Sequence, residues 1–433
     1  MTGVSREPAP QGTATSSLSR NRDFLKLWTA AGFTILGGHV TDVVYPLLVL
    51  WQTGSAGQAG LVGFAALLPQ LVVQLPAGAL IDRLDRRRVM ISADVGCLVA
   101  TGSVAALVVS GHVWLPALLV AAFVQGGCVV FYQLGERAAV PRLVAPEHLA
   151  SAMTRNEARS RVASLLGQPV GSALFAVLRW VPFVFTALMH LVSLLSVVLI
   201  RNPMQGERPE PRNLRTEIAE GVAWMWRQRF LRTVIGLIAA TNVVFRGLTM
   251  ALMVIVHAAG GSAAIVGAVG AAGGIGGALG ALSGTWWMKR VSLGAVAIGG
   301  LAAWAVLVPV LSVLHTPVVL AVVFAANGYV GGVFNVVGGV YVVGITPDVL
   351  QGRVNSVASL VVVGAVSLGA LLSGYLLDAA GILPTILGFT GVLVALAVYA
   401  GASPTVRSRT GPAGRLIPPG EDSPARAGNT AAV

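Results

Sequence analysis

The chain contains long apolar runs that are almost free of charge and are separated by short charged loops. The run AGLVGFAALLPQLVVQLPA carries no charged side chain, and the run VMISADVGCLVATGSVAALVVSG carries one, Asp94. Each is long enough to cross the hydrocarbon core of a bilayer as a helix, which takes about 20 apolar residues. Lipid offers no hydrogen bonds to the backbone, so this pattern restricts the fold to membrane-spanning helices.

About twelve runs of this kind occur along the chain. The expected spans are residues 28–51, 58–81, 89–110, 114–135, 157–179, 181–200, 233–258, 263–287, 292–314, 317–342, 354–378 and 382–402. Hydrophobic residues make up 55% of the chain and charged residues only 11%, values that exclude an ordinary soluble domain. We therefore predict an all-α integral membrane protein with twelve transmembrane helices.

Lysine and arginine fall almost entirely on one side of the threaded spans. They lie in both tails and in the loops around Arg86, Arg142, Arg215, Lys289 and Arg353, whereas opposite loops such as QTGSAGQAG carry none. Basic residues accumulate on the cytoplasmic side of membrane proteins, so both termini are predicted to be cytoplasmic. The net charge of +12 therefore reflects membrane topology and does not indicate nucleic-acid binding.

The longest internal loop divides the chain into two halves. Residues 21–200 and 233–402 are predicted to form two bundles of six helices each, joined by a cytoplasmic linker at residues 201–232. In the linker, apolar residues at helical spacing favour an amphipathic surface helix, with a plain tether as the alternative. Residues 1–20 and 403–433 are rich in polar residues, Pro and Gly and are expected to be disordered tails.

The two halves repeat one another in register. RNRDFLK at Arg20 is matched by RQRFLR at Arg227, and VPRLV around Pro141 is matched by TPDVL around Pro347. Each match lies about 200 residues after its counterpart, which is typical of an internal structural repeat. Transporters built from two pseudo-symmetric halves show repeats of this kind.

The residues offer no constellation for catalysis or for metal binding. We find no paired carboxylate on one span, no metal-ligand spacing and no nucleophile with a base partner, so neither an enzyme nor a cofactor is expected. The two cysteines, Cys97 and Cys128, lie inside apolar spans and are interpreted as packing residues. The glycine-rich run at residues 267–284 also lies inside a span, where close helix packing explains it better than nucleotide binding does.

The loop GALIDRLDRRR at residues 78–88 resembles the cytoplasmic loop between the second and third helices of the major facilitator superfamily. The matching residues are Gly78, Asp82, Arg83, Arg86 and Arg87 or Arg88. NRDFLKLW and VPRLVAPEHLASA extend the similarity to the bacterial exporters that include the enterobactin and macrolide efflux carriers. The resemblance implies the major facilitator fold, with two pseudo-symmetric six-helix bundles.

The resemblance also implies that this loop acts as a cytoplasmic gate, in which Gly78 permits close helix approach. Asp94 lies about two turns into the next span, within reach of a snorkelling Arg86 or Arg87. Glu136, at the cytoplasmic end of the fourth span, would join the same cluster. The alternatives are a positive-inside stop without a mechanical role for the loop, and a plain salt bridge for Asp94.

Asp42 and Arg246 each lie near the middle of the first span of their half, where a charge is costly and marks function. In the superfamily these two helices line the central cavity, so Asp42 is predicted to couple protons or contact substrate. His39 is one turn away, and Arg246 would either pair with Asp42 or attract an anionic substrate group. Asn242 would hydrogen-bond in the same cavity. The alternatives are a structural ion pair that fixes helix register and, for His39 alone, a satisfied interior histidine.

The fifth expected span contains GQPVGS, which resembles the glycine and proline motif of the superfamily's exporters through Gly167, Pro169 and Gly171. A proline bends a spanning helix, and the flanking glycines admit a neighbouring helix. The resemblance implies export of a small organic molecule, such as a drug, antibiotic, siderophore or other secondary metabolite, by alternating access with proton antiport. The alternatives are an importer or facilitator with the same fold, and a membrane scaffold or sensor that transports nothing.

The expected location is a bacterial inner or plasma membrane, because the preference for Arg over Lys and for Ala, Gly and Val is typical of GC-rich bacterial genomes. The expected partners are the lipid bilayer, a small-molecule substrate and protons. A monomer is expected, since this fold forms its pathway within one chain.

Overall fold

The described part of the chain is built of helices. The computed structural model describes residues 18–81, 83–202, 204–205, 229–345 and 348–403, and every regular element in these ranges is an α-helix or a short 3-10 helix. A helix satisfies its backbone hydrogen bonds internally, which is the condition that the apolar spans impose.

The first half contains seven described α-helices. They are α1 (Arg22–Thr53), α2 (Ala56–Val72), α3 (Gln74–Ile81), α4 (Arg86–Val109), α5 (Leu115–Leu143), α6 (Leu149–Val177) and α7 (Val181–Val198). Asn21, Ser55 and Asp85 begin α1, α2 and α4 as N-caps, because each side chain accepts a hydrogen bond from a free backbone N–H of the first turn.

The second half contains six described α-helices. They are α9 (Arg229–Ala258), α10 (Ala263–Arg290), α11 (Leu293–Leu307), α12 (Pro317–Ile345), α13 (Asp348–Ala380) and α14 (Ile382–Ala402). A 3-10 helix, Val308–Ser312, continues α11, and Ser262 and Ser292 cap α10 and α11.

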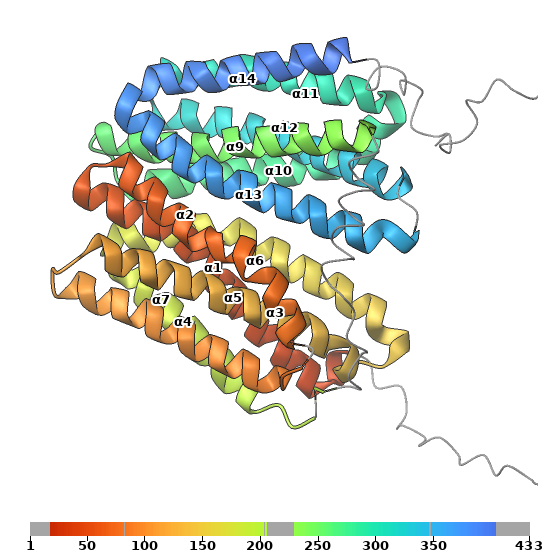
Figure 1. The fold of residues 1–433 in the computed structure, drawn as a ribbon. Coiled ribbons are helices and arrows are strands. Elements are labelled where there is room, and N and C mark those ends of the chain that lie inside the picture. Colours follow the sequence, from red (N-terminus) through yellow and green to blue (C-terminus); the bar gives the residue numbers. More distant parts are fainter. Residues whose placement is uncertain (1–17, 82, 203, 206–228, 346–347, 404–433) are drawn as a thin grey trace, which may run out of the picture.

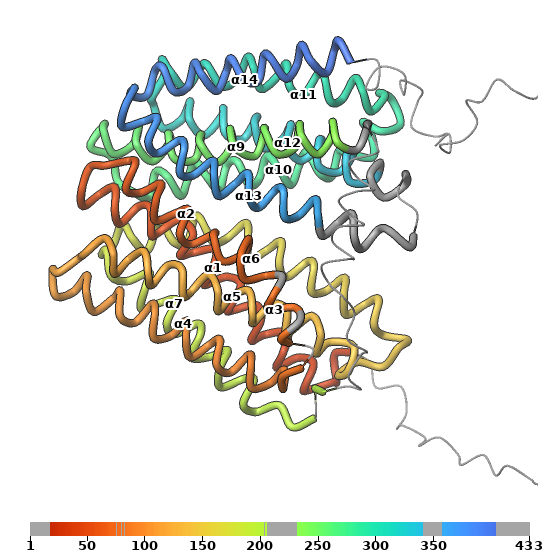
Figure 2. The backbone as a smooth tube through the Cα atoms, viewed as in Figure 1, coloured from red at the N-terminus to blue at the C-terminus, as the bar shows by residue number. Residues whose placement is uncertain are grey.

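The helices form two bundles that lie side by side (Figure 1). Helices α1–α7, coloured red to yellow-green, make one bundle, and α9–α14, coloured green to blue, make the other. The backbone tube shows the same division (Figure 2). The bundles meet where α13 packs on α2 and where α10 packs on α6. The two-bundle helical architecture predicted from the sequence is therefore confirmed.

Eleven of the twelve expected spans each overlap one α-helix, and in the described part of the chain ten helices are long and apolar enough to cross a membrane. The second expected span is split at Val73 into α2 and α3. Pro76 causes the break, because it has no N–H to donate to the Val72 carbonyl and its ring crowds that carbonyl. The fifth expected span is the apolar part of α6, whose first turns, LASAMTRNEARSR, are polar.

The predicted domain boundaries stay predictions, because the parts that would test them lie mostly outside the described residues. The linker at residues 201–232, with its expected amphipathic helix, falls largely in the range 206–228. The tails expected at residues 1–20 and 403–433 are described only at residues 18–20 and 403.

The glycine-rich run lies in α10 and packs against α12. A β-carbon added at Gly276 would overlap the Ala325 carbonyl oxygen, and one at Gly280 would overlap the Tyr329 carbonyl oxygen. Only glycine fits such a backbone-to-backbone contact in a membrane bundle. The run is therefore a helix-packing surface and not a nucleotide loop.

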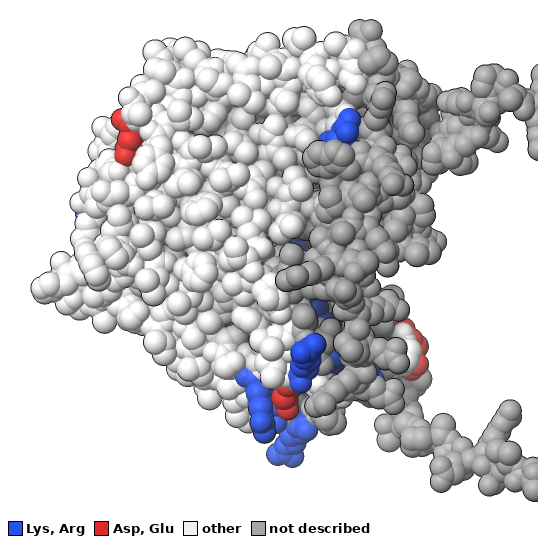
Figure 3. Space-filling view, in the orientation of Figure 1, with Lys and Arg blue, Asp and Glu red and all other residues white. Residues whose placement is uncertain are grey.

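On the face shown in Figure 3, the described charged side chains lie towards the ends of the molecule, and the surface between them is uncharged. Large apolar side chains of the described helices are highly exposed: Leu282 of α10 is 79% and Val306 of α11 is 73% accessible. In water such a surface would be unstable, whereas lipid tails cover it without cost. The distribution of side chains is that of a protein surrounded by a bilayer.

Candidate functional site

The two bundles close on each other at one end along a seam between α2 and α13. A β-carbon at Gly60 of α2 would lie 2.5 Å from the Ala370 carbonyl oxygen of α13. On the other side of the seam, a β-carbon at Gly374 would overlap the Ala56 carbonyl oxygen. The missing side chains let the two backbones touch, so no space for a solute remains between the helices at this end.

Asp378, near the end of α13, caps the first turn of α2 across this seam. Its carboxylate accepts hydrogen bonds from the backbone N–H groups of Ala56 (2.7 Å) and Gly57 (2.8 Å) and from the Ser55 hydroxyl (2.6 Å). A helix N-terminus carries unpaired N–H groups and a partial positive charge, so a carboxylate stabilises it. This contact joins the two halves of the chain.

The GQPVGS segment lies in α6 between α1 and α10. Gly167 faces α1 so closely that a β-carbon there would overlap the His39 side chain, and Gly171 faces α1 as well. Pro169 faces the other bundle: its carbonyl oxygen would lie 3.2 Å from a β-carbon at Gly267 of α10. The segment therefore lets α6 approach both neighbours, while its link to export stays a prediction.

Asp42 and His39 line an open pocket between α1, α2 and α5. Their side chains are 35% and 38% exposed, and His39 Nδ1 lies 3.6 Å from Asp42 Oδ2. Three amides, those of Gln70, Gln125 and Gln133, complete the polar part of the wall. The pocket thus combines one ionisable pair with several neutral hydrogen-bonding groups, a surface suited to a polar organic ligand.

A buried chain of hydrogen bonds fixes one of these amides. The Tyr45 hydroxyl donates to Gln125 Oε1 at 3.0 Å, and Gln125 Nε2 donates to the Thr41 hydroxyl at 2.8 Å. Tyr45 is 1% and Gln125 is 2% exposed, so these polar atoms depend on one another for satisfaction. The Gln125 amide is therefore held in one orientation at the edge of the pocket.

Arg246 extends from α9 past α13 towards α2. A β-carbon at Gly369 would lie 3.2 Å from Arg246 Cβ, and one at Gly63 would lie 3.7 Å from Arg246 Nη2, so the two glycines make room for the side chain. Asp42 is the carboxylate that acts on Arg246 electrostatically. Among the described residues, the ion-pair partner of Asp42 is His39, and the Arg246 guanidinium is not within ion-pair distance of it. The sequence left the pairing open, and in this conformation the two charges attract each other without contact.

Asn242 does not make the hydrogen bond that was expected of it in the cavity. Its Nδ2 donates to the Ile238 carbonyl at 2.8 Å, one turn earlier in the same helix. An amide inside an apolar helix satisfies itself in this way when no better partner faces it. Asn242 is therefore a half-buried residue of α9 whose amide is turned back to its own backbone.

The loop before α4 lies against its own bundle. Arg86 donates to the carbonyl oxygens of Ala138 (2.9 Å) and Met204 (3.0 Å), and Arg87 donates to the Val198 carbonyl at the end of α7. A helix C-terminus exposes carbonyl oxygens and attracts cations, which explains the contact of Arg87 with Val198. Arg83 and Arg88 are exposed.

The structure does not test the expected roles of Gly78 and Asp82 in the gate. Among the described residues, nothing lies within 4 Å of a β-carbon placed at Gly78, so the close helix approach expected there is not present in this conformation. Asp82 lies outside the described residues. The gate stays a prediction for another conformation.

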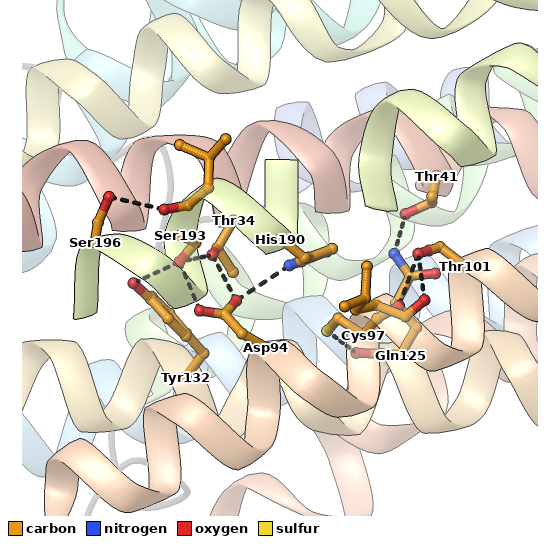
Figure 4. A network of polar contacts seen from close by, with 12 residues as sticks. Thr34, Thr41, Asp94, Cys97, Thr101, Gln125, Tyr132, His190, Ser193 and Ser196 are labelled. Carbon is orange, nitrogen blue, oxygen red and sulfur yellow. Dashed lines mark hydrogen bonds and ion pairs between the residues drawn. The ribbon is translucent and has the colours of Figure 1, made fainter. Parts of the chain in front are cut away.

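Asp94 is buried in a network of polar side chains and does not meet Arg86 or Arg87 as expected (Figure 4). Its Oδ1 lies 3.2 Å from His190 Nδ1 and accepts from the Thr34 hydroxyl at 3.1 Å. Its Oδ2 accepts from the Ser193 hydroxyl at 2.6 Å. Asp94 faces α1 and α7 inside the bundle, whereas Arg86 is buried against the carbonyls of Ala138 and Met204, so the contacts in this conformation differ from the expected ones.

Glu136 does not join Asp94 either. It forms a 2.7 Å ion pair with Arg159 of α6, and both side chains are almost fully buried. Arg159 Nη1 also donates to the Trp28 carbonyl at 3.0 Å. This pair connects α5, α6 and α1, so Glu136 and Asp94 belong to two separate clusters of the same bundle.

Sequence reasoning missed the residues that complete these clusters. His190 was visible as a histidine inside a span, and Asp378 as an acid near a helix end, but neither was assigned a partner. Arg159 lies in the polar first turns of α6, inside the expected span 157–179, and was not singled out. Within the described residues, no group of three or more His, Cys, Asp or Glu side chains is arranged to hold a metal ion.

The chain is similar over most of its length to membrane transporters. It matches the family model described as Major Facilitator Superfamily over residues 27–292 and 235–428. It is 30% identical to the multidrug efflux pump Tap of Mycobacterium tuberculosis over 405 residues, which cover 86% of this chain and 91% of that protein. Identity to macrolide efflux protein A of Streptococcus pyogenes is 23% over 206 residues, covering 46% and 50%. Among solved structures, a bacterial homologue of the human lysosomal transporter Spinster superposes with a TM-score of 0.70 at 15% identity, covering 92% of this chain and 99% of that one.

Proposed function

Because the chain belongs to the Major Facilitator Superfamily, we propose that it exports small organic molecules by alternating access, driven by proton antiport. Family membership makes it a multi-pass membrane transporter and not an enzyme. The relatives named as a multidrug efflux pump and a macrolide efflux protein support drugs or antibiotics as the class of cargo.

The observation that carries the proposal is a polar pocket next to a seam that is closed at one end. The α2–α13 seam shuts that end through Gly60, Gly374 and Asp378, while Asp42 and His39 face the pocket between α1, α2 and α5. Alternating access needs such a closure, which must open when the opposite end shuts. The glycine contacts and hydrogen bonds of this seam can break without any covalent change.

The basic loops support the assignment of the closed end to the outer side of the membrane. Arg86 and Arg87 lie at the end of the first bundle away from Asp378, and basic residues accumulate on the cytoplasmic side. The closed end then faces outward, the pocket is loaded from the cytoplasm, and both termini are cytoplasmic. In the opposite conformation the loop containing Asp82 and Arg83 would close the cytoplasmic face against the second bundle.

Asp42 is the proposed coupling carboxylate. Its side chain is about one-third exposed to the pocket. The carboxylate interacts electrostatically with both His39 and the more distant Arg246. Cargo binding beside Asp42, or closure of the pocket, would change the environment of the carboxylate and hence its proton occupancy. Arg246 also gives the pathway one fixed positive charge for an anionic group of the cargo. A monomer is sufficient for this mechanism.

Transport by inverted membrane vesicles tests the proposal. Erythromycin, a macrolide, and ethidium, a lipophilic cation, serve as probes with and without an imposed proton gradient. Uptake that depends on the gradient and is lost in Asp42→Asn, but not in the exposed-acid control Glu157→Gln, would support proton-coupled export through Asp42. Gradient-dependent uptake that persists in Asp42→Asn would keep the exporter and remove Asp42 as its coupling site. Uptake of both probes that ignores the gradient would rule out antiport.

A further inference from the structure

A second ionisable pair lies in the first bundle, away from the pocket. Asp94 of α4 and His190 of α7 are both 0% exposed, and Asp94 Oδ1 lies 3.2 Å from His190 Nδ1. Thr34 of α1 and Ser193 of α7 also donate to the carboxylate, and Ser193 is linked in turn to the Tyr132 hydroxyl at 3.1 Å (Figure 4). Helices α1, α4, α5 and α7 therefore meet at one carboxylate.

The arrangement determines which nitrogen of His190 is free. A carboxylate only accepts hydrogen bonds when ionised, so the His190 hydrogen that faces Asp94 is on Nδ1. In the neutral ring, Nε2 then carries the lone pair. His190 Nε2 is buried and has no hydrogen-bond partner, and neither has the nearby buried hydroxyl of Thr186. A basic nitrogen that is fully buried and has no hydrogen-bond partner is rare in proteins, and it requires an explanation. A proton that binds there during the functional cycle is one.

His190 Nε2 faces a glycine of α1. A β-carbon at Gly37 would lie 3.0 Å from Thr186 Cγ2, a tight contact, and 3.5 Å from His190 Nε2, an ordinary contact distance. The next residue, Gly38, lines the pocket that contains Asp42. His190 Nε2 and the pocket therefore lie beside successive glycines of the same turn of α1.

The charges around the pair do not neutralise it. The titratable groups that face it are Tyr132 and Cys128 on α5 and Cys97 on α4, all neutral in their ordinary state. Glu136, one turn from Tyr132, is already paired with Arg159. The groups contributed by α1 and α7 are hydroxyls. With His190 neutral, Asp94 leaves one uncompensated negative charge in the bundle, and a proton on Nε2 removes it.

We propose that Asp94 and His190 form a second proton-binding site of the transport cycle, in which the transported proton binds His190 Nε2. The inference rests on the proposed proton antiport and adds a site to it. One proton from the outer side adds to Nε2 and gives an imidazolium–carboxylate pair. The same proton leaves Nε2 towards the cytoplasm and restores the neutral ring, so that no other bond forms or breaks.

Helix α1 connects this site to the cargo pocket. Thr34 and Asp42 lie on the same helix, and Thr34 donates to both Asp94 and Ser193. When Nε2 is protonated, Asp94 forms an ion pair with the imidazolium, and its hydrogen bond with Thr34 weakens. Helix α1 can then move against α4 and α7 and carry Asp42 with it. Proton binding in the bundle would in this way bias which end of the protein is open.

A ligand-free measurement of the conformational equilibrium tests the site. Spin labels at Gln58→Cys and Leu383→Cys, in a Cys97→Ala/Cys128→Ala background, report the distance across the outer face by electron–electron resonance in lipid nanodiscs. Asp42→Asn should retain a pH-dependent transition. In this background, which removes the other proposed coupling group, we expect the population with a closed outer face to change with a single midpoint between pH 5 and 9, and His190→Gln and Asp94→Asn to abolish that change.

A milder variant keeps the test decisive if the buried substitutions impair folding. Ser193→Ala leaves both ionisable groups in place but removes a hydrogen bond to the carboxylate, so the midpoint should rise by about one pH unit. Ser196→Ala is the matched control, because Ser196 is half-buried, lies one turn further along α7 and donates to the Val192 carbonyl of its own helix.

The outcomes separate this inference from the proposed function. An unshifted midpoint in Ser193→Ala, a transition that persists in His190→Gln, or no transition in the labelled background would overturn the site, whatever the vesicles transport. Gradient-driven uptake by wild-type vesicles decides antiport independently. A pH transition without gradient-driven uptake would likewise remove the coupling role proposed for the pair.

Discussion

The carboxylate of Asp378 accepts a 2.7 Å hydrogen bond from the backbone N–H of Ala56, the first residue of α2, although the two residues are 322 positions apart. The end of α13, in the second half of the chain, therefore caps the start of α2, in the first half. Because this capping bond exists only while the bundles are closed, it contributes to the stability of one conformation and not of the other.

Removing the carboxylate should favour opening of this end. Loss of a side-chain N-cap costs about 1 kcal/mol, so Asp378→Ala should reduce the ratio of closed to open protein roughly fivefold. The distance between spin labels at Gln58 and Leu383 measures this population directly. Glu157→Ala, which removes an exposed acid paired with Arg161 inside one bundle, is the matched control. An unchanged distance distribution in Asp378→Ala would show that the cap does not stabilise closure.

The α2–α13 seam should not tolerate even one methyl group. In Gly60→Ala the new carbon would meet the Ala370 carbonyl oxygen at 2.5 Å, and overpacking of this kind costs about 1–3 kcal/mol. We expect the outer end to stay open and ethidium efflux from loaded cells to fall about tenfold. Gly102→Ala is the control, because a β-carbon there meets no atom within 4 Å. Equal efflux by the two variants would contradict the proposed role of the seam.

The ion pair between Glu136 and Arg159 should be far more sensitive to substitution than the ion pair between Glu157 and Arg161. Arg159→Met leaves Glu136 buried and uncompensated, which costs about 3–5 kcal/mol, whereas breaking an exposed pair costs about 1 kcal/mol or less. Thermal unfolding in detergent should show a large loss for Arg159→Met and almost none for Arg161→Met. Adding Glu136→Gln to Arg159→Met should restore much of the loss, and failure to do so would argue against an electrostatic cause.

The hydroxyl of Tyr45 should affect cargo affinity through Gln125. In Tyr45→Phe, Gln125 Oε1 loses its donor in a buried place, so the amide can turn away from the pocket. The half-saturating concentration of the transported probe should rise about tenfold, with a smaller change in maximal rate. Tyr399→Phe, at a residue that is 54% exposed, is the control. A loss of maximal rate alone would point to folding or conformational change instead.

The sequence predicted the helices well because the information for a membrane span is local. Each span is an apolar run of bilayer length, and the expected range 382–402 even coincides with α14. Deviations arose where local chemistry competes with hydropathy, as at Pro76, which divides one expected span into α2 and α3. Polar ends such as the first turns of α6 were read as loops, although they continue the helix.

The contacts of the ionisable residues were harder to predict, because they depend on how each helix is rotated about its axis. Asp94 was correctly identified as an unusual charge inside a span, but it was paired with the arginines nearest in sequence. Its partners Thr34 and Ser193 are 60 and 99 residues away. Asp42 and His39 were placed together correctly, since one helical turn separates them and no tertiary information is needed.

The contact between α10 and α12 has a consequence for how cargo reaches the protein. Their backbones touch at Gly276 and Gly280, so no side chain could swing aside there to open a passage. A lipophilic compound dissolved among the acyl chains therefore has no lateral doorway between these two helices. Any direct entry from the membrane interior has to use a different pair.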